Sequence, residues 1–131
     1  MASKSLFILL CSEEHEKIQM AAMLASVAAV SDRPVHVFVS MGAMYAFAKD
    51  GGEDRYKGGA FSDVLKKQKA PDAMELFSTG KMLGEMTVSP CAMALDVLEW
   101  GMDDLVPDLF DEPLGLTKFL SDAEEGQFIS L

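Results

Sequence analysis

The chain has 131 residues, of which 50% are hydrophobic and 24% are charged, and this length and composition are typical of one globular domain with a sizeable core. Its 21 acidic residues outnumber the 11 basic ones, which gives a formal net charge of -10. Such a surface would repel nucleic-acid phosphates and anionic membranes, so neither is expected as a partner, whereas a basic protein would be attracted.

The first predicted element is a short apolar run at residues 4–11, typical of a strand buried on both faces. This run is too short to span a bilayer, and acidic residues follow it in place of a cleavage pattern. We therefore expect a cytoplasmic protein without a leader, in which the two cysteines stay reduced. Ser12 is a favourable N-cap for a helix that would continue to residue 33.

The next segments repeat the alternation of strand and helix. Residues 34–40 are β-branched and apolar and indicate a second buried strand, and 41–52 indicate a short helix closed by Gly51 and Gly52. This order predicts right-handed crossovers and a parallel sheet. The glycine pairs and charges of 51–60 favour an exposed loop.

The second half of the chain extends the same pattern. Pro71 separates two predicted helices, and a third strand leads directly into a helix that begins at Cys91. We expect a single domain over residues 1–131, an α/β three-layer sandwich whose mostly parallel sheet has about five strands, doubly wound as in flavodoxin. The predicted helices are 61–69, 71–84, 91–100 and 113–126, and the predicted strands are 85–90, 105–110 and 127–131.

The cysteines provide the main functional hypothesis. In a parallel α/β sheet, reactive groups gather at the carboxyl ends of strands, where Cys11 and Cys91 both lie. If the first and third strands are neighbours, one crevice contains both thiols. Unpaired amides in the first turn of the helix would favour a Cys91 thiolate, and the helix dipole adds roughly 0.3–1 kcal/mol. The competing interpretation is a small hydrophobic residue in the core, since free cysteine is among the most buried residue types.

Other candidate residues give weaker signals. His15, among three glutamates, is most simply part of a solvated helical turn, and the alternative is a contribution to the crevice near Cys11. Ser89, two residues before Cys91, is a further auxiliary candidate. The two histidines and two cysteines do not have zinc-ligand spacing, and the glycine pairs match no phosphate-binding loop. Five methionines are more often core residues than part of a cofactor site; these are Met20, Met23, Met82, Met93 and Met102.

With these residues identified, the chain resembles the DsrE/DsrF-like family of sulfur-relay proteins, in the branch often labelled peroxiredoxin-like. The stretch "CAMALDVLEWGMDDL" is similar to the family pattern C-x-M-x-M-D-V-x-x-x-G, with Leu95 in place of the second methionine. The segments "VHVFVSMGAMYAFAK" and "LGLTKFLSDAEEGQFISL" resemble its second strand and its closing segment. The peroxiredoxin label fits poorly, because that chemistry needs Thr or Ser three residues before the cysteine and Val88 stands there.

The resemblance implies a function and an assembly. It implies a five-stranded sandwich that forms homotrimers or homohexamers, and a cysteine that accepts sulfane sulfur as a persulfide and passes it on, typically with a TusA-like partner. Cys91 is the position to which that role transfers, and no metal or organic cofactor is required. The alternatives are a non-catalytic binding or assembly module with a buried Cys91 and, more weakly, a nucleotide or flavin pocket at the switch point of the sheet.

Overall fold

A computed structural model describes residues 4–131 and shows an α/β fold built on one parallel sheet. The sheet has four strands in the spatial order β3-β2-β1-β4, and every neighbouring pair is parallel. The predicted α/β class and parallel sheet are confirmed, with four strands in place of about five. The strands are β1 (Leu6–Leu10), β2 (Val35–Val39), β3 (Met86–Pro90) and β4 (Gln127–Ser130).

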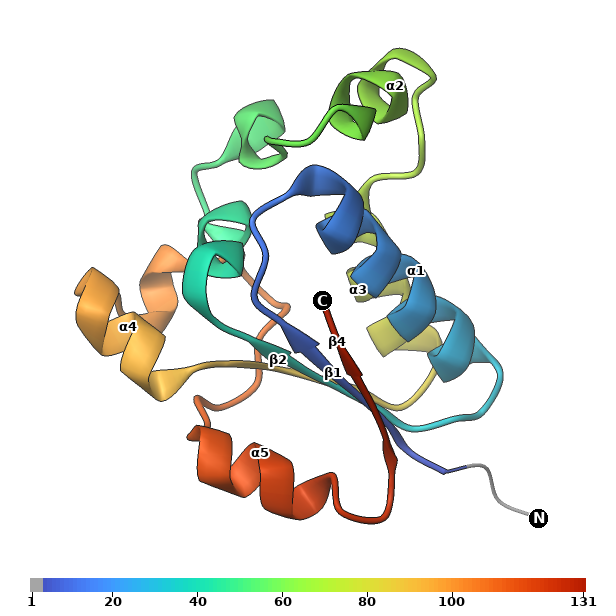
Figure 1. Ribbon diagram of the computed structural model, residues 1–131, viewed down its shortest axis with the longest axis vertical. Helices are drawn as coiled ribbons and strands as arrows, with labels where there is room; N and C mark the ends of the chain where they lie inside the picture. The colour runs from blue at the N-terminus through green and yellow to red at the C-terminus, as the bar shows by residue number, and fades with distance from the viewer. Residues whose placement is uncertain (1–3) are drawn as a thin grey trace.

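Helices cover both faces of the sheet and make three layers (Figure 1). The longest helices, α1 (His15–Val30) and α3 (Ala73–Leu83), pack side by side on one face. Helix α5 (Leu116–Asp122) covers the other, where the Phe119 ring lies 5.0 Å from that of Phe38. The remaining elements are η1 (Met41–Phe47), η2 (Gly52–Arg55), α2 (Phe61–Lys67), α4 (Ala92–Leu98) and η3 (Met102–Asp104). None of the helices in residues 4–131 is both long and apolar enough to cross a membrane.

Small residues allow α1 and α3 to approach closely. Ala22, Ala25 and Ala29 are buried along α1. A Cβ added to Gly84, just after α3, would lie 2.2 Å from the carbonyl oxygen of Ala29. The backbone of Gly84 is extended, so its requirement for glycine is purely steric.

The start of α1 differs from the prediction. The helix begins at His15 with Glu14 as its N-cap residue, not at Ser12. The reason is a tertiary contact, because the His15 amide donates to the carbonyl of Lys57 at 2.9 Å and thereby fixes where the chain turns into the helix. The Ser12 hydroxyl instead accepts a hydrogen bond from the Glu14 amide at 3.1 Å. Pro71 does separate two helices, and Asp72 caps α3.

The predicted strand at 105–110 is wrong. Asp108 has a left-handed backbone (φ 62°), which interrupts extended structure, and Leu105 forms only an isolated bridge. Residues 111–114 instead run along the open edge of β3. There the Asp111 amide donates to the Val88 carbonyl, and the Leu114 amide donates to the Pro90 carbonyl. The Asp111 carboxylate accepts the Val88 amide at 2.8 Å, so a side chain replaces part of the strand ladder.

Candidate functional site

The two cysteines lie at the same edge of the sheet. Leu10, Val39 and Pro90 end three neighbouring strands in register, and Cys11, Ser40 and Cys91 follow them. The parallel ladder continues through these positions, because the Ser40 amide donates to Leu10 at 2.9 Å and the Cys91 amide to Val39 at 2.8 Å. This row of two thiols and a hydroxyl at the carboxyl ends of β1, β2 and β3 is called the thiol edge below.

One crevice for both cysteines would require that β1 and β3 be neighbours, and they are not. Strand β2 lies between β1 and β3, and two strand spacings put the Cys11 and Cys91 backbones roughly 10 Å apart. A disulfide needs Cα atoms within about 7 Å. Cys11 and Cys91 therefore cannot form one without movement of the backbone.

Cys91 is the N-cap residue of α4, one position before the predicted first turn. Cys91 is 5% exposed, and its carbonyl accepts the Leu95 amide at 3.0 Å. The Ala92 amide is occupied by the carbonyl of Leu114 at 2.9 Å. The amides that an N-cap side chain ordinarily meets are therefore those of Met93 and Ala94, although the sulfur accepts no capping hydrogen bond in this conformation.

Cys11 is more accessible but stays a neutral thiol. It is half-buried, and its carbonyl accepts the Ala43 amide at 3.1 Å where η1 folds back over the thiol edge. Burial raises the pKa of the Cys11 thiol, and the nearby Cys91 raises it further. Because the thiolate is the nucleophile, Cys11 is a poor nucleophile at neutral pH.

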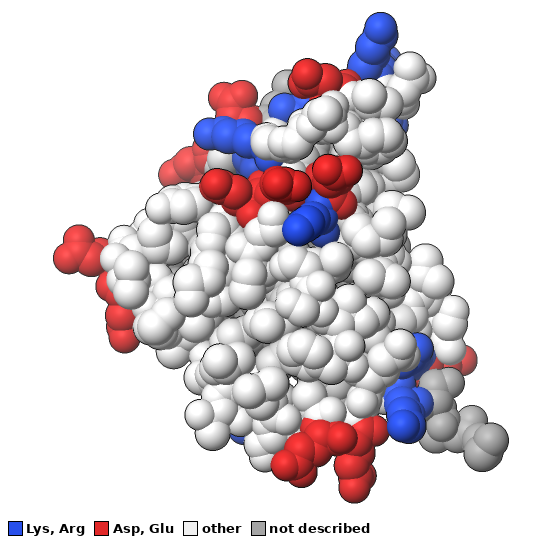
Figure 2. All heavy atoms as spheres, viewed as in Figure 1, with Lys and Arg blue, Asp and Glu red and all other residues white. Residues whose placement is uncertain are grey.

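A broad uncharged face crosses the middle of the molecule. Figure 2 shows it between two charged ends, over the region that Figure 1 assigns to the end of β4 and α1, with carboxylates at its margin on the α4 side. All five methionines expected in the core are exposed, which corrects that prediction. Met93 and Val97 on α4 and Met41 beside the thiol edge are exposed apolar side chains. Further exposed apolar side chains on α1 and η1 are Met20, Met23, Val27 and Tyr45.

Ser89 does not share a cavity with Cys91. It is buried on β3 and lines an open groove of about 740 Å³ together with His36 and Thr87, on the face covered by α5. The His36 Nδ1 lies 2.8 Å from the Thr87 hydroxyl, and its ring stacks on Phe7. Burial lowers the pKa of His36, and the carboxylates of Asp122 and Glu85 oppose that shift.

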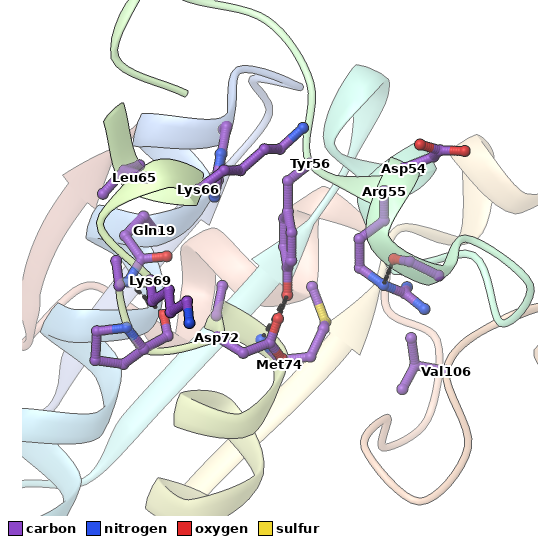
Figure 3. A pocket seen from close by; sticks show the side chains of 15 residues that line it. Gln19, Asp54, Arg55, Tyr56, Leu65, Lys66, Lys69, Asp72, Met74 and Val106 are labelled. Carbon is purple, nitrogen blue, oxygen red and sulfur yellow. Dashed lines mark hydrogen bonds between the residues drawn. The ribbon is translucent and has the colours of Figure 1, made fainter. Parts of the chain in front are cut away.

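His15 is buried at 4% exposure, so its interpretation as a solvated helical turn is wrong. Its ring stacks on Tyr56 with centroids 4.7 Å apart, and its Nδ1 lies 2.8 Å from the Ser62 hydroxyl. Burial lowers the pKa of His15; Lys66 lowers it further, while Asp72 acts in the opposite direction. His15 thus belongs to a second cavity (Figure 3) that neither cysteine lines.

That cavity holds residues that no motif in the sequence identified. The Tyr56 hydroxyl donates to the Asp72 carboxylate at 2.6 Å and accepts the Met74 amide at 3.0 Å. Burial raises the pKa of Tyr56, and its hydrogen bond to Asp72 adds to the effect. The one usable signal was Asp72 after Pro71, which predicts a helix cap and says nothing of a ligand.

Comparison with known proteins supports the fold alone. No family model and no curated protein matches this chain. It is similar in structure to the protein of unknown function MTH1491 from Methanobacterium thermoautotrophicum, with a TM-score of 0.65 over 98% of this chain and 100% of that one. The two share 10% sequence identity, so the likeness extends to the arrangement of strands and helices and not to chemistry.

Proposed function

We propose that this protein is a sulfur carrier, in which Cys91 accepts sulfane sulfur as a persulfide and passes it to another protein. The observation that supports this best is the position of Cys91, which follows a parallel strand directly and caps the next helix. The Met93 and Ala94 amides are the groups that would stabilise a sulfur anion there.

The transfer step leaves the overall oxidation state unchanged. The Cys91 thiolate attacks the outer sulfur of a donor persulfide, a new S–S bond forms at Cys91, and the S–S bond of the donor breaks. The electron pair of the broken bond leaves with the donor as its thiolate. Return of the sulfur to an acceptor thiolate follows the same step in reverse, so neither an oxidant nor a reductant is needed.

The burial of Cys91 means that transfer needs a local opening. Leu114 is hydrogen-bonded to the residues on both sides of Cys91. Its amide donates to the Pro90 carbonyl at 3.0 Å, and its carbonyl accepts the Ala92 amide at 2.9 Å. Release of residues 111–114 would free the start of α4 while leaving the central strands paired. The exposed methionines nearby offer the adaptable apolar surface on which a visiting protein can rest.

The sulfur donor, the cellular compartment and the oligomeric state are part of this proposal. The donor is a TusA-like or other persulfide-carrying protein, for which a basic surface would complement the net charge of -10. We place the chain in the cytoplasm, where both thiols stay reduced. Homotrimers or homohexamers would cover part of the uncharged face, which otherwise leaves much apolar surface in water.

Intact-mass spectrometry tests the proposal. The protein is incubated with a persulfidated donor protein, separated from it and weighed under non-reducing conditions. The wild type and Cys11→Ser are expected to gain the mass of one sulfur atom, and Cys91→Ser is expected to gain none. The proposal fails if the wild type gains no sulfur, or if Cys91→Ser gains as much as Cys11→Ser.

The 5% exposure of Cys91 favours a second candidate, a non-catalytic binding or assembly module. In that case Cys91 is a core residue, and Cys91→Ala keeps both the native oligomer and its partners. Sedimentation of Cys91→Ala, combined with the mass experiment, separates the two candidates. An unchanged assembly together with no sulfur uptake by the wild type would favour the module.

A further inference from the structure

The cavity beside His15 carries a second, independent inference. It measures about 620 Å³ and lies between η2, α2 and the first turns of α1 and α3. This volume falls in the range of small-molecule sites, which is roughly 300–1,000 Å³, and exceeds what a single inorganic ion fills. Its apolar wall includes Leu65, Met74 and Val106.

The charged groups around the cavity are unusual for so acidic a chain. Three of the 11 basic residues line it, Arg55, Lys66 and Lys69, against the two carboxylates of Asp54 and Asp72. Figure 3 shows the two lysines on the α2 side, Arg55 on the η2 side and the Asp54 carboxylate turned away from Tyr56. The cavity is thus locally positive in a protein of net charge -10.

The polar groups divide into those already paired and those free for a ligand. The Asp72 carboxylate accepts both the Tyr56 hydroxyl and the Glu75 amide, so it is occupied. Among the described side chains, Lys66 and Lys69 form no ion pair. Arg55 is held by backbone carbonyls: its Nη1 donates to Ala46 and Ala48, and its Nε to Gly52. None of these bonds uses Nη2.

Lys69 lines the cavity from a position just after the end of α2. Lys69 follows α2 in the left-handed conformation (φ 55°), with its amide bonded to Lys66 and the next amide to Leu65. This is the helix-ending arrangement in which glycine is ordinarily found. A lysine in that position bears a conformational cost and places its side chain along the cavity wall.

We propose that this cavity binds a small organic anion, a carboxylate or phosphate ester whose apolar part lies against Met74 and Tyr56. Lys66 and Lys69, on the α2 side of Tyr56, are the cations that receive the anionic group, and Arg55 lies on the other side of that ring (Figure 3). The stacked rings of His15 and Tyr56 form a fixed wall, because Ser62 and Asp72 hold their polar atoms. Neither cysteine lines the cavity, so anion binding here is tested independently of sulfur transfer at Cys91.

Two-dimensional amide NMR tests the site, with phenyl phosphate, benzoate and inorganic phosphate as probes. We expect saturable shifts at residues 65–74 with phenyl phosphate or benzoate, and the tighter of the two identifies the anion class. Inorganic phosphate is expected to bind more weakly, because it leaves the apolar wall uncovered. Equal binding of inorganic phosphate, or no saturable shift at these residues, would overturn the proposal.

Matched lysine variants make the test specific. Lys66→Gln and Lys69→Gln should each weaken the organic probe about tenfold, the loss expected for one charge-assisted hydrogen bond. Lys67→Gln is the control, because Lys67 is exposed on the same helix turn and does not line the cavity. If Lys67→Gln weakened binding of the organic probe as much as the other two variants, the loss would reflect the overall charge of the protein, and the site would be refuted.

Discussion

Replacing Tyr56 by phenylalanine removes one oxygen that makes a part-buried and a buried hydrogen bond. The hydroxyl donates to the Asp72 carboxylate at 2.6 Å and accepts the Met74 amide at 3.0 Å. A hydrogen bond to a charged group contributes about 1.5–3 kcal/mol, and an amide left unpaired in a buried position costs about 1–3 kcal/mol. Because one atom makes both bonds, the two terms overlap, and we expect a loss of about 2–4 kcal/mol in the free energy of unfolding.

Urea unfolding followed by circular dichroism measures this loss as a lower midpoint with an unchanged slope. Tyr45→Phe is the matched control, because the Tyr45 side chain is exposed and its ring makes a T-shaped contact with Trp100. The control should stay within about 0.5 kcal/mol of the wild type, as surface substitutions usually do. A Tyr56→Phe loss below about 0.5 kcal/mol would refute the assigned role of this hydroxyl.

Three further predictions use the same unfolding assay. Gly84→Ala places a Cβ 2.2 Å from the Ala29 carbonyl and should cost at least about 2 kcal/mol, whereas Gly101→Ala, with open space around it, should cost far less. Lys69→Gly should raise stability by about 1 kcal/mol by relieving the left-handed backbone, and no gain would contradict that strain. The lowered pKa of His15 means that the unfolded chain binds more protons as pH falls from 7.5 to 5, so stability should fall over that window. His15→Gln should reduce that slope, leaving the part due to His36, and an unchanged slope would count against a buried neutral imidazole.

The parallel sheet and the position of Cys91 were predictable because they depend on local patterns. Apolar runs of strand length alternated with helical segments, and Pro90 before Cys91 marked the end of a strand. In the structure the Pro90 nitrogen faces the outer edge of β3, where no ladder hydrogen bond is lost. A proline in that position is compatible with a strand, as the sequence indicated.

The errors concern contacts between residues far apart in the chain. The burial of His15 depends on Tyr56 and Ser62, more than 40 residues away, and no local pattern indicates it. The apolar residues at 105–110 have the composition of a strand, yet the left-handed turn at Asp108 directs the chain elsewhere. The exposed methionines were missed because they were assigned to the core on residue type alone, and an apolar residue type fits a core and an exposed apolar face equally well.

The central claim is that Cys91 can be reached without global unfolding, and the alkylation rate of native Cys11→Ser, whose remaining thiol is Cys91, tests it most directly. We predict a measurable rate that does not depend on urea at low concentrations, as expected for a local opening that exposes little surface. Asp111→Ala removes the carboxylate that holds Val88 and should increase that rate. A rate that rises with urea along the slope of global unfolding would show that Cys91 becomes accessible only when the whole domain opens, and would contradict the account.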